Sequence, residues 1–123
     1  MYIMKTPSDI RLSKDKKQIT ITFDEVDYPM SSEFLRVYSP SAEVQGHGPG
    51  QEVLQLNKEK VEIEKLQPTG NYAIAIHYSD SHSTGIYSWN YLYHLAINHG
   101  QLWSDYCQKV NENKNNNYQK VVI

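Results

Sequence analysis

Alternating apolar and polar positions mark short strands in the first third of the chain. Between residues 19 and 23, isoleucine and phenylalanine alternate with threonine, which places the apolar side chains on one face of an extended segment. Residues 10–12 form a second, shorter segment with apolar residues at alternate positions, and a polar, lysine-rich turn at 13–18 separates the two. This pattern predicts a β-hairpin near the N-terminus, with residues 28–30 as a third short strand.

A second set of strands is predicted between residues 61 and 87. The clearest is 71–78, where Tyr72 and three further large side chains share one face, and alanine and histidine share the other. Residues 61–64 alternate as on a half-exposed strand, and 84–87 follow a polar turn as a returning strand.

Helical periodicity occurs in three further segments. Ser31 or Ser32 can cap a short helix whose apolar face lies within residues 34–38. Ser88 can cap another, in which apolar residues recur at i, i+3, i+4 and i+7 from Trp89. Residues 102–110 carry a similar stripe and predict a final helix.

The predicted elements form one α+β domain, with a small, mostly antiparallel β-sheet and short helices, two of them C-terminal. Gly100 fits the position that follows the first of these two helices. From residue 111 the composition becomes polar and rich in asparagine, with too little apolar surface to stabilise an ordered structure. We therefore expect the domain to span residues 1–110 and residues 111–123 to form a disordered tail.

Composition and charge exclude several classes of protein. The 123 residues carry a net charge of −2, so no strong positive field directs the chain toward nucleic acid or an anionic membrane. No window approaches the roughly 20 apolar residues of a membrane span. Cys107 is the only cysteine, which excludes a disulfide within the chain and a cluster held by four thiolates. A cytoplasmic protein in a reducing compartment is expected.

Three stretches, taken together and in this order, carry a likeness to a known family. They are residues 33–44, residues 46–51, and residues 70–73 continuing to 82–92. Together they resemble the gamma-butyrobetaine hydroxylase-like N-terminal domain family, whose function is uncharacterised. The resemblance covers residues 6–110, which is nearly all of the expected ordered domain.

The resemblance implies an N-terminal domain without the catalytic domain that follows it in the hydroxylase. In the hydroxylase, a domain similar to this one precedes a catalytic domain that uses iron and 2-oxoglutarate, and we expect the 123 residues here to lack that catalytic domain. Similar domains also occur fused to P-loop ATPases thought to carry iron–sulfur clusters. We therefore expect, by analogy, a non-enzymatic domain that docks onto a protein partner in iron–sulfur or redox metabolism.

The resemblance also implies the loss of a metal site. In the hydroxylase, the module binds zinc through a Cys-Pro-Cys-x-x-Cys segment and a later histidine. The matching positions here are Ser39, Ser41, Val44 and His82. Serine is a poor zinc ligand and valine is none, so we expect the zinc site to be lost while the local scaffold remains.

Two histidines keep a metal-binding alternative open. His47 lies between glycines and His82 lies in a polar turn, and Asp80 or Glu43 can supply a carboxylate to complete a candidate zinc or iron site. The other interpretation is that both histidines satisfy backbone groups in two loops that pack together. No cofactor is expected under that second interpretation.

The remaining sequence features favour structural roles. The glycine-rich loop at 46–50 lacks the Lys-Ser/Thr ending of a phosphate-binding P-loop. Ser39 and Ser41 lack the spacing of a nucleophile elbow. Cys107 lies on the apolar stripe of the last helix, so we expect a buried and unreactive thiol.

The leading hypothesis is a binding or adaptor domain that contacts a protein partner through residues 39–51 and 82–89. The alternative is a metal-binding domain that uses His47 and His82. The sequence does not decide whether the chain forms a homodimer. The residues assigned to the contact surface are Arg36, Ser39, Ser41, Glu43, His47, Gln51, Asp80, Tyr87 and Trp89.

Overall fold

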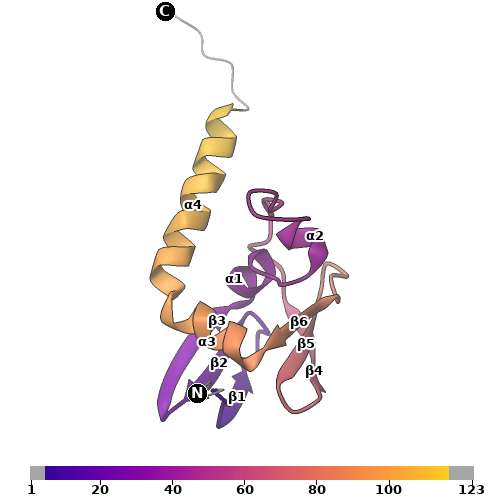
Figure 1. Cartoon of the computed structure of the whole chain (residues 1–123), viewed down its shortest axis with the longest axis vertical. Helices are drawn as coiled ribbons and strands as arrows, with labels where there is room; N and C mark the ends of the chain where they lie inside the picture. Colours follow the sequence, from indigo (N-terminus) through magenta and orange to yellow (C-terminus); the bar gives the residue numbers. More distant parts are fainter. Residues whose placement is uncertain (1–4, 117–123) are drawn as a thin grey trace, which may run out of the picture.

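Two small antiparallel sheets and four helices make up residues 5–116, the part of the chain that the structure, a computed structural model, describes (Figure 1). Sheet A contains β1 (Asp9–Leu12), β2 (Gln18–Phe23) and β3 (Val26–Ser31). Sheet B contains β4 (Ile63–Thr69), β5 (Ala73–Tyr78) and β6 (Gly85–Ser88). The helices are α1 (Ser32–Val37), α2 (Ala42–Gln45), α3 (Trp89–Ile97) and α4 (His99–Asn116). The predicted α+β class is confirmed.

Sheet A consists of two successive hairpins. β2 is the central strand and pairs antiparallel with both β1 and β3. The turn between β2 and β3 has positive φ at Asp24 (50°) and Glu25 (67°), which matches the right-handed twist of the flanking strands. Pro29 cannot donate a hydrogen bond to a neighbouring strand and therefore suits β3, an edge strand. The predicted hairpin and third strand are confirmed.

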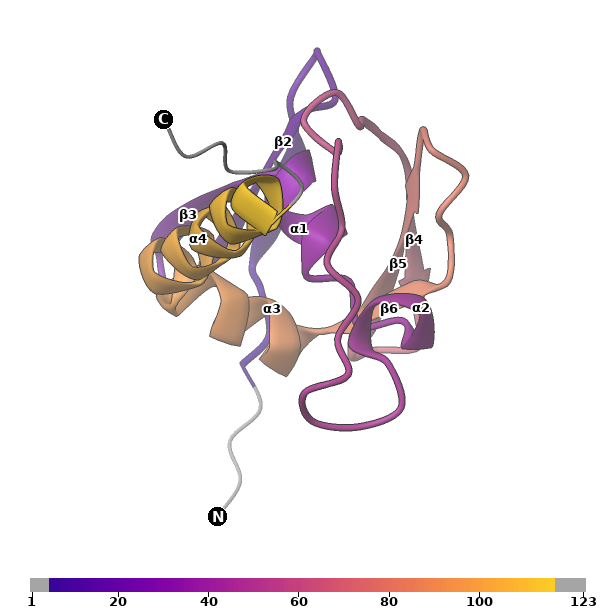
Figure 2. The ribbon, with the colours of Figure 1, turned by 90° about the horizontal axis from the view of Figure 1, so that it is seen from above.

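The hydrophobic core lies between the two sheets, with α1 between them (Figure 2). The apolar face of β2, predicted from its alternation with threonine, is almost fully buried. Ile74 and Ile76 of β5 face the same cluster, as do Phe34 of α1 and Leu92 of α3. Burial of each such side chain contributes about 1.5–3 kcal/mol, so this shared core joins the two sheets into one domain.

Two serines begin helices as predicted. The Ser31 hydroxyl accepts a hydrogen bond from the Phe34 N–H over 3.0 Å at the start of α1. The Ser88 hydroxyl accepts from the Tyr91 N–H over 3.1 Å at the start of α3. Each serine satisfies a backbone donor that has no partner within its helix, which determines where the helix starts.

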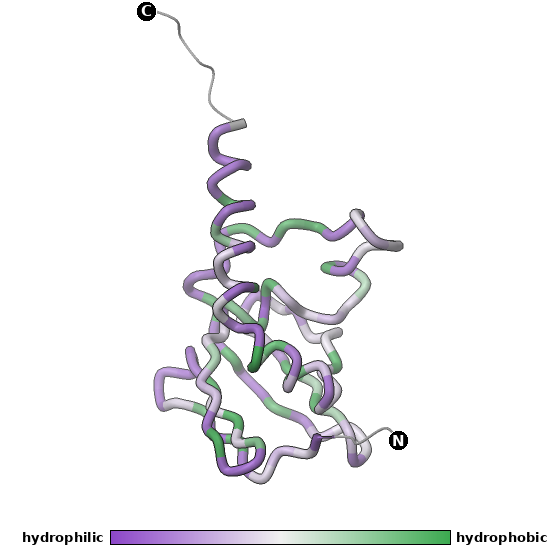
Figure 3. The backbone as a smooth tube through the Cα atoms, turned by 60° about the vertical axis from the view of Figure 1, so that its left-hand side comes forward, coloured by the Kyte–Doolittle hydropathy of each residue, from purple (hydrophilic) through white to green (hydrophobic). Residues whose placement is uncertain are grey.

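The last helix is longer than predicted. α4 begins at His99, so Gly100 lies in its first turn rather than after α3, and the helix continues to Asn116. The prediction of a disordered tail was therefore wrong for residues 111–116, and residues 117–123 lie outside the described residues. An established helix gains a backbone hydrogen bond with each added residue, and the Gln108 amide donates to the Glu112 carboxylate one turn later. The hydrophilic end of α4 projects beyond the rest of the protein (Figure 3).

The start of β5 also differs from the prediction. The strand begins at Ala73 instead of residue 71, and Tyr72, which we placed on the face of the large side chains, lies before the strand and is 58% exposed. The Tyr72 carbonyl accepts a hydrogen bond from the Trp89 N–H over 2.9 Å, so this backbone group serves the start of α3.

A helix that crosses a membrane needs roughly 20 consecutive, mostly apolar residues. No helix within residues 5–116 is both long enough and apolar enough to do so.

Candidate functional site

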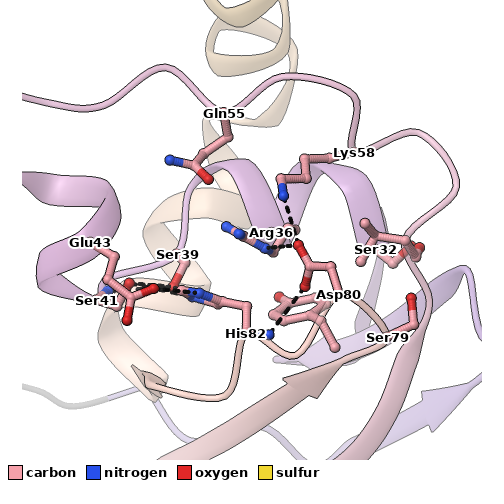
Figure 4. Close-up of polar contacts among 12 residues, drawn as sticks. Ser32, Arg36, Ser39, Ser41, Glu43, Gln55, Lys58, Ser79, Asp80 and His82 are labelled. Carbon is pink, nitrogen blue, oxygen red and sulfur yellow. Dashed lines mark hydrogen bonds and ion pairs between the residues drawn. The ribbon is translucent and has the colours of Figure 1, made fainter.

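Three of the predicted site residues converge inside the protein beside α2 (Figure 4). Ser39 and Ser41 lie in the connection from α1 to α2, and His82 lies in the turn between β5 and β6. The His82 Nε2 atom is 2.8 Å from the Ser39 Oγ and 3.3 Å from the Ser41 Oγ. All three residues are buried, so they form one hydrogen-bonded cluster within the fold.

A carboxylate borders this cluster. Glu43 Oε2 lies 3.3 Å from His82 Nδ1. Because an ionised carboxylate can only accept hydrogen bonds, Nδ1 carries the proton, and Nε2 accepts from the Ser39 hydroxyl. Burial, followed by the charge of Arg36, lowers the pKa of His82 and therefore favours the neutral ring.

A buried arginine anchors the turn that carries His82. The Arg36 Nε donates to Asp80 Oδ2 over 2.9 Å, and the Lys58 Nζ donates to the same oxygen over 2.7 Å. The His82 backbone N–H donates to Asp80 Oδ1 over 3.2 Å. Burial raises the pKa of Asp80, but the hydrogen bonds from Lys58 and Arg36 outweigh burial and hold that pKa at about 2. Asp80 therefore joins α1, the segment before β4 and the β5–β6 turn.

Two buried tyrosines connect the cluster to the core. The Tyr87 hydroxyl donates to the Leu35 carbonyl over 2.6 Å, and the Tyr78 hydroxyl lies 2.7 Å from that of Tyr87. Burial raises the pKa of both tyrosines. At Gly85, an added Cβ would lie 2.6 Å from the Ser39 Oγ and 3.0 Å from a Tyr87 ring carbon. The close approach of β6 to the cluster therefore requires glycine at this position.

The residues that we assigned to a contact surface divide into an exposed group and a buried group. The exposed group is Glu43, His47, Gln51 and Asp80. The buried group is Arg36, Ser39, Ser41, Tyr87 and Trp89. A partner that approaches the surface meets only the exposed group, and the buried side chains position the loops from within.

A segment that the sequence patterns did not single out crosses the face formed by α3 and α4. Residues 50–59, which we call the strap, contain no helix or strand. The Tyr106 hydroxyl of α4 donates to the Gln55 carbonyl over 2.6 Å, and the Val53 N–H donates to the Val44 carbonyl over 2.9 Å. The strap is therefore attached to both α4 and α2. The feature of the sequence that could have identified the strap is its group of apolar residues, which follows neither helical nor strand periodicity.

Two cavities lie between the strap and the helices. The first has a volume of about 560 Å³, and its walls include Leu54 of the strap, Leu95 of α3 and Leu102 of α4. The second has a volume of about 390 Å³ and is lined by the strap, by Glu33 and by α4. Tyr106 lines both cavities. Cys107, predicted to be buried, is only half-buried and lines the second one.

One known protein family matches most of the chain. The family described as gamma-butyrobetaine hydroxylase-like, N-terminal, matches residues 10–93, which is more than half of the chain. The chain belongs to the gamma-butyrobetaine hydroxylase-like N-terminal family. The match is to this N-terminal domain and includes no catalytic domain.

Solved structures similar to this family member show the same fold. One NMR solution structure is 44% identical with a TM-score of 0.78, and the match covers 89% of this chain and 86% of that chain. A second is 40% identical with a TM-score of 0.76, covering 93% and 88%. A crystal structure of a DUF971 family protein of unknown function from Acidithiobacillus ferrooxidans is 30% identical with a TM-score of 0.61, covering 74% and 92%. No curated protein matches the chain.

The side chains at the positions that the family resemblance assigned to zinc do not fit that metal. Ser39 and Ser41 approach His82, but Val44 is a buried apolar residue. Structural zinc sites use thiolate and imidazole ligands in a closed tetrahedron, and two hydroxyls with one imidazole do not supply them. Hydrogen bonds to His82 take the place that metal ligation would have in this local scaffold.

The other metal-binding prediction pairs His47 with His82. His47 is exposed in the loop that follows Gly46, a glycine with φ of 74°, whereas His82 is buried against Ser39. Within residues 5–116, no group of three or more histidine, cysteine, aspartate or glutamate residues is arranged to hold a metal ion. Metal binding through the two histidines stays a prediction.

Proposed function

We propose that this gamma-butyrobetaine hydroxylase-like N-terminal domain is a cytoplasmic, non-enzymatic module that binds a protein partner. The binding surface consists of the strap and the exposed residues Glu43, His47 and Gln51 next to it. The observation that carries the proposal is the cavity of about 560 Å³ between the strap and helices α3 and α4. Apolar side chains from several elements line it, and Val53 on the strap is 53% exposed. A concave surface that combines apolar and polar side chains, with an exposed apolar residue beside it, is typical of a binding site.

Three exposed residues of the predicted contact surface are close in sequence to residues that line this cavity. The lining includes Val44 and Gln45 of α2 and Gly50, and each of Glu43, His47 and Gln51 is within two positions of one of them. The predicted loop surface and the strap therefore form one continuous candidate interface. A partner from iron–sulfur or redox metabolism stays a prediction of the family resemblance.

The arrangement of Ser39, His82 and Glu43 supports a positioning role more than a catalytic one. A hydroxyl, an imidazole and a carboxylate occur in the order used by serine hydrolases. However, Ser39 has no exposed surface, and neither cavity is lined by Ser39 or His82. A substrate would have to displace the loop between α1 and α2 to reach the Ser39 Oγ.

Affinity capture with two matched variants tests the proposed interface. Val53→Asp places a charge on the strap, and Val26→Asp places the same charge at the start of β3, on a valine that is 50% exposed. The wild-type chain, each variant and a bead-only control would be compared by quantitative mass spectrometry of the captured proteins. Circular dichroism would confirm that both variants are folded.

A partner recovered by the wild type and by Val26→Asp, but lost with Val53→Asp, would support the proposal. Equal recovery of every captured protein by Val53→Asp and wild type would contradict a binding role for the strap. Elemental analysis of the untagged chain addresses the alternative, since stoichiometric zinc or iron that disappears in His82→Ala would favour the metal-binding prediction.

A further inference from the structure

The second cavity, at the α4 side of the strap, combines an apolar wall with two carboxylates. Leu56 of the strap and Trp103, Tyr106 and Val110 of α4 supply apolar and aromatic surface. The rings of Trp103 and Tyr106 are 5.4 Å apart between centroids. The volume of about 390 Å³ is in the range of sites that take a small ligand or a single large side chain.

The two carboxylates belong to Glu33 in the first turn of α1 and Glu59 at the end of the strap. Neither forms an ion pair with any residue in the part of the chain that the structure describes. Burial, followed by the charge of Glu59, raises the pKa of Glu33. Burial, then Glu33 and Glu59, raises the pKa of Tyr106 to about 12. Both carboxylates therefore impose a negative potential on the aromatic wall of the cavity.

A cavity lined by apolar and aromatic side chains and by two carboxylates matches one type of protein side chain. Lysine and arginine carry a long aliphatic stem that packs on apolar surface and a terminal cation that needs a carboxylate or an aromatic face. A carboxylate ligand would be repelled by Glu33 and Glu59, and a purely aliphatic side chain would leave both charges without a partner. Lys114 also lines the cavity, and within residues 5–116 it forms no ion pair with either glutamate.

We propose that the cavity between the strap and α4 receives a lysine or arginine side chain of the protein partner, with its stem on Trp103 and Leu56 and its cation at Glu33 and Glu59. This inference rests on the proposed function in assuming that the occupant is a protein. It adds the chemistry of the partner residue and places that residue in the smaller cavity, which shares Tyr106 with the larger one.

NMR titration of the full chain with capped tripeptides tests the inference directly. The probes are acetyl-Ala-Lys-Ala-amide and acetyl-Ala-Arg-Ala-amide, and acetyl-Ala-norleucine-Ala-amide is the control with the same stem and no charge. We expect the charged peptides to shift the Trp103 indole and Leu56 methyl signals, with millimolar affinity and at least tenfold more tightly than the norleucine peptide. Equal binding of the norleucine peptide, or shifts confined to other surfaces, would overturn the assignment.

Charge variants make the test specific for the two carboxylates. The double variant Glu33→Gln/Glu59→Gln should weaken lysine peptide binding at least tenfold, whereas Glu62→Gln/Glu64→Gln, on and beside β4, should leave it unchanged. Lys114→Gln should strengthen binding about twofold, because the competing positive charge is removed. Unaltered binding by Glu33→Gln/Glu59→Gln would refute the inference. The single variant Glu59→Gln repeats the test at an exposed position that does not affect the start of α1.

The outcome can be separated from that of the proposed function. Suppose that a captured partner requires Val53 but still binds Glu33→Gln/Glu59→Gln. This result would contradict the assignment of a lysine or arginine side chain to the cavity, and it would still support the strap as the interface. A partner lost with both Val53→Asp and Glu33→Gln/Glu59→Gln, but retained by Glu62→Gln/Glu64→Gln, would support both.

Discussion

The Ser39 hydroxyl donates a hydrogen bond to the imidazole of His82 across 43 residues of sequence, with 2.8 Å between Ser39 Oγ and His82 Nε2. This contact connects the loop after α1 to the turn after β5. It lies beside Gly85 and Tyr87 of β6, so three segments that are far apart along the chain meet at one buried point. The contacts around this point lead to predictions about stability.

Ser39→Ala should lower the free energy of unfolding by about 1 kcal/mol, the typical net contribution of one hydrogen bond. The loss is limited because the Ser41 Oγ remains 3.3 Å from His82 Nε2. Ser41→Ala should cost less, since its hydroxyl is farther from the ring. Urea unfolding followed by circular dichroism measures both, and a larger effect for Ser41→Ala would contradict the assigned geometry.

Gly85→Ala should destabilise the protein by about 1–3 kcal/mol, because its Cβ would collide with the Ser39 Oγ and the Tyr87 ring. Gly100→Ala is the matched control, since an added Cβ there meets no atom within 4 Å. Gly100 lies within α4, where alanine favours the helix by up to about 1 kcal/mol. Thermal unfolding should therefore give a lower Tm for Gly85→Ala only, and equal Tm values for the two variants would show that β6 can move away.

Tyr87→Phe should lower the free energy of unfolding by about 1–3 kcal/mol. The substitution removes the hydroxyl that donates to the Leu35 carbonyl and leaves the buried Tyr78 hydroxyl without its partner. Tyr72→Phe, at an exposed tyrosine, should change stability by no more than about 0.5 kcal/mol. Chemical denaturation measures the free energy of unfolding of both variants. Equal values for Tyr87→Phe and Tyr72→Phe would contradict the buried hydrogen bonds of the Tyr87 hydroxyl.

Asp80→Asn should be most destabilising near neutral pH. The folded-state pKa of Asp80 is about 2, below the unfolded value of about 3.9. The ionised side chain therefore adds stability at pH values above about 4, and this contribution is lost as the pH falls through about 2. Near neutral pH the variant also leaves the buried Arg36 without its carboxylate partner, which adds to the loss.

Denaturant unfolding of the wild type and Asp80→Asn between pH 7 and pH 2 measures this linkage. The difference in unfolding free energy between the two proteins should shrink as the pH falls below about 4. A difference that stays constant down to pH 2 would mean that the contacts with Arg36 and Lys58 do not lower the pKa of Asp80. Glu64→Gln, an exposed position on β4, should match the wild type at pH 7.

Much of the fold could be predicted from local patterns. The apolar alternation in residues 19–23 predicted the buried face of β2, and Ser31 and Ser88 predicted the starts of α1 and α3. These features depend on neighbours within a few residues, so the sequence pattern contains the information. The end of α4 was predicted wrongly because composition alone omits the gain from extending an existing helix.

The candidate site was less accessible to sequence reasoning. The family resemblance correctly grouped Ser39, Ser41 and His82, but it did not show that they are buried, while Glu43 and His47 are exposed. The strap and its two cavities were missed, since residues 50–59 have no periodicity to identify them. A cavity is formed by surfaces from several elements, and no short segment carries its shape.

The sequence by itself determined the buried face of β2, the caps of α1 and α3 and the α+β class, because side-chain spacing and capping groups act through the nearby backbone. Tertiary structure alone decided that Ser39 meets His82, that Arg36 meets Asp80 and that the strap lies on α4 through Tyr106. These contacts join residues more than 40 positions apart. They exist only because burial of one shared core brings sheet A, sheet B and the C-terminal helices together.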